Sequence, residues 1–341
     1  NQEKIASWEK SVEEHTDENL KKNLLVLDEE NGEETLIAVN FDKMLVRLLR
    51  EVKYLKLLGF EVPEKAKHLY DKVDIYRTQT GNLDLIVQMY NEILSTLLPV
   101  EKPLLRDRME LVDKILKPGI ENLKWNDNTI EPFIKEAMDV ITEVSALVKK
   151  MKENVRKMKK MCDGWCKPLY DRKNKPMSPD DLEQTHGASV DQRLSLIKDE
   201  GKEINKLLKD TMDHIKSSRK SIKWKAYQDY INCVIIEGIT KAIVSSINHL
   251  SEQINIEYNR HNDLQPMFDI KVCLGDTDVV FEPPIRGCES ENGIKDIIFR
   301  IVEGFISIAS LIQRLDNQQL DYLVEVKNQM SVFFAMSHIS K

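Results

Sequence analysis

The feature that most constrains this chain is a long apolar seam, a line of apolar side chains that recur in alternating steps of four and three residues. It consists of Ile130, Ile134, Ala137, Ile141, Val144, Val148, Met151, Val155, Met158 and Cys162. An α-helix brings residues with this spacing onto one face, whereas a strand would alternate them in steps of two. The seam extends over about four heptads and predicts one long helix that packs against other helices.

Similar seams recur along the chain, and residues that end helices separate them. The seams run from Phe41 to Leu55, Leu194 to Ile215, Tyr227 to Ile254 and Ile294 to Leu315. The breaks fall at Gly59 with Pro63, Gly81, Pro99 to Pro103, Pro118 with Gly119, Pro168, Pro176 with Pro179, and Pro266. With only 12 Gly and 11 Pro in 341 residues, we predict an all-α fold, an elongated series of helical bundles.

Two segments depart from the helical pattern. Near 268–283, alternating apolar residues flank Gly275 and Asp276, which predicts one small β-hairpin. Residues 171–187 are polar and rich in turn-forming residues, which is typical of a loop or linker. We therefore divide the chain into a first helical bundle region at 1–170, this linker at 171–187, and a second helical bundle region at 188–341.

The sequence contains no recognisable arrangement for chemistry. Its glycines do not form the motifs that hold nucleotide phosphates, and no His lies three or four residues from another His or a Cys. The five cysteines have no repeated spacing, as in intracellular proteins with reduced thiols, although Cys162 and Cys166 are four residues apart. The acidic run from Asp28 to Glu34 fits a solvated turn better than a calcium loop. We expect no catalytic residue, cofactor or metal in this segment.

Charge and hydropathy exclude two further classes of protein. A formal net charge of -7 argues against a general nucleic-acid binder, because neutralising phosphates requires an excess of Lys and Arg. No uninterrupted apolar stretch approaches the roughly 20 residues that span a bilayer, so we expect no membrane insertion. The charged start of the chain is unlike a signal peptide, and we expect the sequence to be a segment of a longer protein.

One local reversal of charge stands out in this acidic chain. Basic residues accumulate between Lys149 and Lys175, and Lys152, Arg156, Lys159 and Lys160 follow a helical spacing. The simpler interpretation is that they form the solvated side of the long helix. The functional interpretation is that this face attracts an acidic partner.

Several motifs mix residue types in an order that helix periodicity does not require. The first contains Asn40, Phe41, Arg50, Glu51, Gly59 and Pro63. The others are Pro118 and Gly119 with Trp125, Trp224 with Tyr227 and Tyr230, Pro266-Met267-Phe268, and Phe281-Glu282-Pro283. In this order they resemble the N-terminal tail, or stem, of dynein heavy chains, and the hairpin and final helix most resemble the axonemal outer-arm gamma type. Lys43 and Pro284 depart from the family pattern.

The resemblance implies a function for the whole protein and another for this part. The whole heavy chain would be a microtubule minus-end-directed ATPase of the cytoplasm and the ciliary or flagellar axoneme, with ATP and Mg bound in a distant motor ring. The tail would be non-catalytic. It would hold heavy chains side by side and bind intermediate chains, light chains, and docking or neighbouring axonemal proteins.

Two other interpretations fit the helical pattern without the resemblance. An unrelated helical tether or spectrin-like interaction rod would share the seams but would not require the motif from Asn40 to Pro63. A helical enzyme could assemble a site from scattered carboxylates such as Glu51, Asp139 and Glu237.

Overall fold

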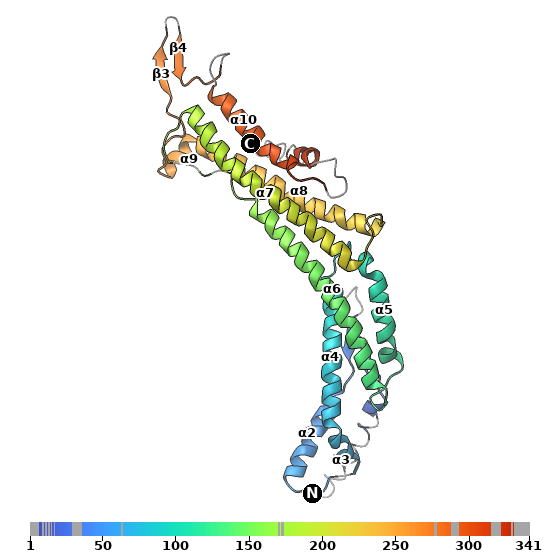
Figure 1. Cartoon of the computed structure of the whole chain (residues 1–341). Coiled ribbons are helices and arrows are strands. Elements are labelled where there is room, and N and C mark those ends of the chain that lie inside the picture. The colour runs from blue at the N-terminus through green and yellow to red at the C-terminus, as the bar shows by residue number, and fades with distance from the viewer. Residues whose placement is uncertain are drawn as a thin grey trace. The chain divides into compact units, whose positions relative to one another are not determined.

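The structure is a computed structural model. It describes residues 7–8, 10, 12, 14, 16, 18–28, 36–62, 64–169, 171, 174–275, 278–287, 293–314, 322–328 and 330. The chain folds into two compact units, residues 1–150 and 151–341, and helix α6 (Ile130–Gly164) contributes to both. Long helices dominate each unit, so the prediction of a mostly helical fold is confirmed (Figure 1).

Unit 1 combines helices with a small antiparallel sheet. Its elements besides α6 are β1 (Leu25–Asp28), β2 (Leu36–Val39), α2 (Lys43–Leu57), α3 (Glu64–Asp71), α4 (Val73–Thr96) and α5 (Lys102–Glu121). Strands β1 and β2 pair with Leu25 opposite Val39 and Asp28 opposite Leu36. The Asn91 side chain of α4 fixes this sheet, because it accepts a hydrogen bond from the Ile37 N–H and donates one to the Ile37 carbonyl, at 3.2 and 2.9 Å.

This first hairpin was not predicted. Each of its strands has four residues, which is too short for an alternating pattern to stand out from helical seams. The acidic run assigned to a turn connects the two strands, and beyond Asp28 it lies outside the described residues.

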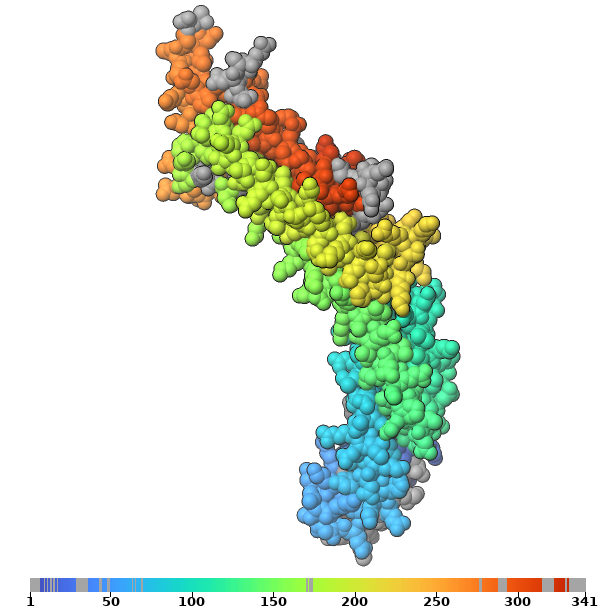
Figure 2. Space-filling view, viewed as in Figure 1, coloured from blue at the N-terminus to red at the C-terminus, as the bar shows by residue number. Residues whose placement is uncertain are grey.

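Unit 2 is a helical bundle with one hairpin. It contains the second part of α6, α7 (Pro179–Ile215), α8 (Ile222–Ile254), α9 (Ile256–His261), β3 (Lys271–Leu274), β4 (Val279–Glu282), α10 (Ile294–Ile306) and the 3-10 helix η2 (Ser307–Ser310). Helix α10 packs on both α7 and α8. The β3–β4 hairpin confirms the prediction at 268–283, and Figure 2 shows it standing out from the helices of this unit.

Helix α8 forms the apolar centre of unit 2. By length and composition it could cross a membrane, but 50% of its most apolar window is buried inside the structure. Ile231, Ile235, Ile239 and Ile243 are fully buried. Burial against neighbouring helices accounts for the apolar character of α8, as expected for a core helix.

The structure corrects the predicted linker at 171–187. Residues 179–187 are the first turns of α7, so only the part before Pro179 is irregular. The Ser178 hydroxyl accepts a hydrogen bond from the Asp181 N–H at 3.1 Å, Pro179 occupies the first turn, and Asp180 lies at the positive end of the helix dipole. These residue types serve turns and helix starts equally well, which is why the sequence was misread. The division between units falls after Lys150 within α6, and not in this segment.

Candidate partner-binding surface

The predicted basic residues of α6 lie on one face of the helix within unit 2. Lys152, Arg156, Lys159 and Lys160 are spaced four, seven and eight residues from the first, which places them along one side of a helix. Lys152 is half-buried and the other three are exposed. The side of the helix next to them carries the seam residues Met151, Val155, Met158 and Cys162, all of them buried.

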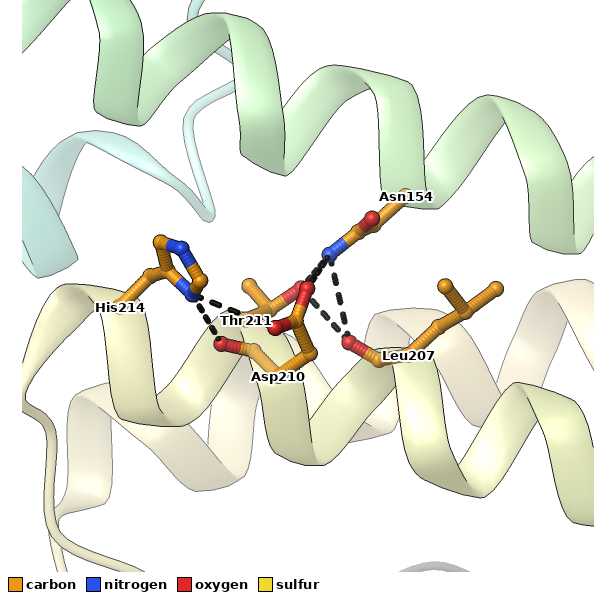
Figure 3. A network of polar contacts seen from close by, with 5 residues as sticks. All are labelled: Asn154, Leu207, Asp210, Thr211 and His214. Atoms are coloured by element: carbon orange, nitrogen blue, oxygen red, sulfur yellow. Dashed lines mark hydrogen bonds and ion pairs between the residues drawn. The ribbon is translucent and has the colours of Figure 1, made fainter.

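A buried amide fixes the rotation of α6 and therefore the direction of its basic face. Asn154 is 0% exposed and donates hydrogen bonds from Nδ2 to α7 (Figure 3). Its acceptors are the Thr211 Oγ1, the Asp210 Oδ2 and the Leu207 carbonyl, at 2.9, 3.1 and 3.4 Å. These bonds form only in one register of the two helices, because a rotated Asn154 would be buried without acceptors.

Two further contacts hold α6 in place at its C-terminal end. The Trp165 indole N–H donates to the Glu200 carboxylate of α7 at 2.5 Å. On the other side, α8 approaches closely because Gly238 has no side chain, and a Cβ there would lie 2.7 Å from the Cys162 Cβ. Contacts with both neighbouring helices therefore determine which side of α6 is buried, and Arg156, Lys159 and Lys160 stay exposed.

The positive charges on this face are only partly compensated. Lys157 pairs with Glu153 at 2.9 Å, and the Lys159 ammonium lies 5.7 Å from the Tyr230 ring centroid. The pKa of Glu237 is lowered, mainly by its hydrogen bond to Lys241 and less by Lys159. Arg156 and Lys160 have no carboxylate partner within the part of the chain that the structure describes. The face therefore keeps a net positive charge that an acidic partner can neutralise.

The cysteine pair does not form a reactive site. Burial, with smaller effects of nearby acids, raises the pKa of Cys162 to about 12, and burial also raises the pKa of Cys166. Both thiols therefore stay protonated near neutral pH, whereas metal binding and redox chemistry require the thiolate. No group of three potential metal ligands occurs among the described residues.

The family-motif residues of unit 1 have mostly structural roles. Trp125 is 2% exposed, donates its indole N–H to the Asn40 carbonyl at 2.9 Å, and packs edge-on against Phe41 at 4.8 Å between ring centroids. Pro118 lies inside α5, and Gly119 after it lets Phe133 approach. These residues join the start of α2 to the end of α5.

The motif residues around α2 divide into packed and exposed ones. Glu51 accepts hydrogen bonds from the Trp8 indole and from Arg47, at 2.9 and 3.2 Å. Gly59 has a φ of 76°, which suits the residue that ends α2. Arg50 is exposed, and Pro63 lies outside the described residues.

In unit 2, the motif residues Trp224 and Tyr227 are core residues of α8. They are 1% and 0% exposed, and their ring centroids are 5.4 Å apart.

The three carboxylates considered for an enzyme do not form one site among the described residues. Glu51 belongs to unit 1, and Glu237 of unit 2 pairs with Lys241 at 2.5 Å. Asp139 borders a surface recess of unit 1 that also contains Lys135.

Sequence reasoning missed several buried polar residues of unit 2, among them Asn154 and His186. Asn154 lies beside the seam, and its only signal in the sequence was its helical spacing, three residues after Met151 and four before Met158. His186 of α7 is 6% exposed and packs on Phe305 of α10, with ring centroids 5.2 Å apart. Its position within a segment assigned to a linker hid its burial. Neither residue forms an arrangement typical of catalysis.

Comparison of the sequence with known proteins shows which family it resembles. The family model described as "Dynein heavy chain, N-terminal region 1" matches residues 1–133. The chain is 31% identical, over 98% of its length, to the dynein beta chain of the flagellar outer arm of Chlamydomonas reinhardtii, and 32% identical, over 95%, to the ciliary dynein beta chain of Heliocidaris crassispina. It is 29% identical, over 96%, to dynein axonemal heavy chain 17 of Mus musculus.

The chain belongs to the axonemal dynein heavy-chain family. It spans 8% of the length of the Chlamydomonas relative and 7% of each of the other two. The predicted family is thus confirmed, and the expected ciliary or flagellar location agrees with the names of these relatives. The outer-arm gamma type stays a prediction, because the outer-arm and ciliary relatives named here are beta chains.

Proposed function

We propose that this part of the dynein heavy chain is a non-catalytic tail scaffold and that the basic face of α6 binds an acidic segment of another dynein-arm subunit. One observation carries the proposal: Asn154 fixes α6 so that its apolar seam is buried, while Arg156, Lys159 and Lys160 are exposed on one face together with the half-buried Lys152. A helix held in one register presents its charges in a constant pattern, which favours specific over general attraction.

The partners that we propose are other heavy chains, intermediate chains, light chains, and docking or neighbouring axonemal proteins. Catalysis by the whole protein would take place in a distant motor region that holds ATP and Mg, and the segment described here would contribute attachment. Long helices suit this role, because axial load is shared by successive backbone hydrogen bonds and by interdigitated side chains. Helices α6 and α7, with 35 and 37 residues, are the candidates for carrying that load.

The test is affinity capture from a ciliary or flagellar extract with the chain as bait. We expect wild-type bait to recover dynein heavy, intermediate or light chains. A variant with Lys152, Arg156, Lys159 and Lys160 changed to Glu should lose one of them while keeping its helix content. The matched control changes Lys198, Lys202, Lys206 and Lys209, all exposed on α7, to Glu. Equal loss in both variants would mean that net charge, and not the α6 face, governs binding.

A further inference from the structure

Helix α2 of unit 1 has an exposed face that its own packing does not explain. Its buried side contributes Val52, which joins Val12 and Ala66 in a small core with Trp8, Val62 and Tyr70 packed against it. On the other side, Val46, Tyr54 and Leu57 are 39%, 63% and 73% exposed. Leu58 and Phe60, which follow the helix, are 70% and 54% exposed. So many large apolar side chains close together are typical of an interaction surface.

The exposed face has the spacing of a second helical seam. Val46, Arg50, Lys53 and Leu57 follow in steps of four, three and four residues, which is the spacing of side chains that meet a partner helix. This outer seam has apolar residues at both ends and basic residues in the middle. Tyr54 lies beside it, and its ring extends the apolar surface.

The charges on this face select the partner. Arg50 and Lys53 have no carboxylate partner among the described residues, and the acid within α2, Glu51, is already bonded to Trp8 and Arg47. A second copy of α2 would set the same cations against each other, which disfavours self-association. In a helix that lies on an anionic membrane the cations occupy a polar face beside the apolar one, whereas Arg50 and Lys53 lie within the seam between Val46 and Leu57. A helix with acidic side chains opposite these cations meets neither obstacle.

We propose that the outer seam of α2 docks an amphipathic helix whose own seam has apolar residues at its ends and Asp or Glu in its centre. The apolar ends would cover Val46 and Leu57, and the central carboxylates would pair with Arg50 and Lys53. Arginine suits this position, because its planar guanidinium binds a carboxylate through two parallel hydrogen bonds. This docking site is separate from the α6 face and needs neither Lys152 nor Arg156.

The experiment is site-specific photo-crosslinking in the intact heavy chain, assembled in its dynein complex and in cilia. A benzophenone amino acid replaces Leu57, and mass spectrometry identifies the attached peptide. We expect one dominant adduct with a helical segment that carries Asp or Glu at its central seam positions. Arg50→Glu with Lys53→Glu should lower its yield about tenfold. The control, Arg106→Glu with Lys117→Glu on α5, makes the same charge change at exposed residues and should leave the yield unchanged.

Each other outcome overturns this inference. An adduct with a second copy of the chain would show self-association, an adduct with lipid would show membrane contact, and a basic or non-helical peptide would contradict the charge argument. Absence of any adduct would show that the outer seam has no occupant. This inference rests on the proposed function only for the choice of the dynein complex. Failure to find the Leu57 adduct would contradict this inference, but it would not change what is expected of the α6 face.

Discussion

The close contact between α6 and α8 leads to a quantitative prediction for Gly238→Ala. The new Cβ would lie 2.7 Å from the Cys162 Cβ and 3.2 Å from its Cα, both far inside the usual separation of carbon atoms. A side chain cannot rotate away from this contact, because it involves the backbone of α6. The helices must therefore separate, and overpacking of this kind costs about 1–3 kcal/mol.

The higher helix propensity of alanine offsets part of that cost. Replacing glycine by alanine within a helix raises the free energy of unfolding by about 1 kcal/mol. For Gly238→Ala we therefore expect a net destabilisation of roughly 0–2 kcal/mol. Gly187→Ala in α7 provides the matched control, because its Cβ would have no atom within 4 Å. The free energy of unfolding of Gly187→Ala should therefore rise only through the higher helix propensity of alanine. The difference between the two variants, about 1–3 kcal/mol, then isolates the helix contact.

The assay is urea unfolding of wild type and both variants, with free energies taken from midpoints at equal slopes. Two further variants, Cys162→Gly alone and Cys162→Gly combined with Gly238→Ala, complete a double-mutant cycle. Because Cys162→Gly removes the clashing Cβ, the cycle should show favourable coupling. If Gly238→Ala were as stable as Gly187→Ala, the close approach of α6 and α8 would be refuted.

Three further predictions concern individual residues. Burial lowers the pKa of His186 from its usual 6.5 to about 4. As the pH falls from about 6.5 to about 4, the unfolded chain therefore binds more protons than the folded one. The free energy of unfolding should decrease by up to about 3 kcal/mol as the pH falls through that window. His186→Leu should flatten this part of a pH–stability curve, and an unchanged slope would contradict the burial. Asn154→Ala should lower the free energy of unfolding by about 1–3 kcal/mol in urea unfolding, because buried acceptors on α7 lose their donor; no change would argue against the hydrogen-bond network. Gly59→Ala should lower the melting temperature, at a cost of about 1 kcal/mol for a left-handed φ of 76°, and an unaltered value would refute that backbone conformation.

The long helices were predictable because burial imposes a simple rule on the sequence. Every member of the Ile130–Cys162 seam is buried, and in the weaker seam of α7 the residues Ile197, Ile204 and Leu208 are buried as well. A helix of this length must hide one face, so its apolar period is visible without knowledge of its neighbours.

Features that depend on a distant partner or on ambiguous local signals were not predictable. Asn154 is explained only by acceptors more than 50 residues away on α7. The start of α7 was misread because Ser178 and Pro179 also favour turns. On the candidate surfaces, the sequence correctly placed Lys152 and Arg156 on one helical face, but it could not separate exposed apolar residues such as Leu57 from buried ones.

The most direct test of the scaffold proposal is lysine crosslinking with mass spectrometry on an intact dynein complex purified from cilia or flagella. The account predicts crosslinks from Lys159 or Lys160 of α6 to another subunit, next to a cluster of Asp or Glu, and weakening of these crosslinks at high salt. If these lysines crosslinked only within their own chain while lysines on α7 reached other subunits, the α6 face would not be the partner-binding surface.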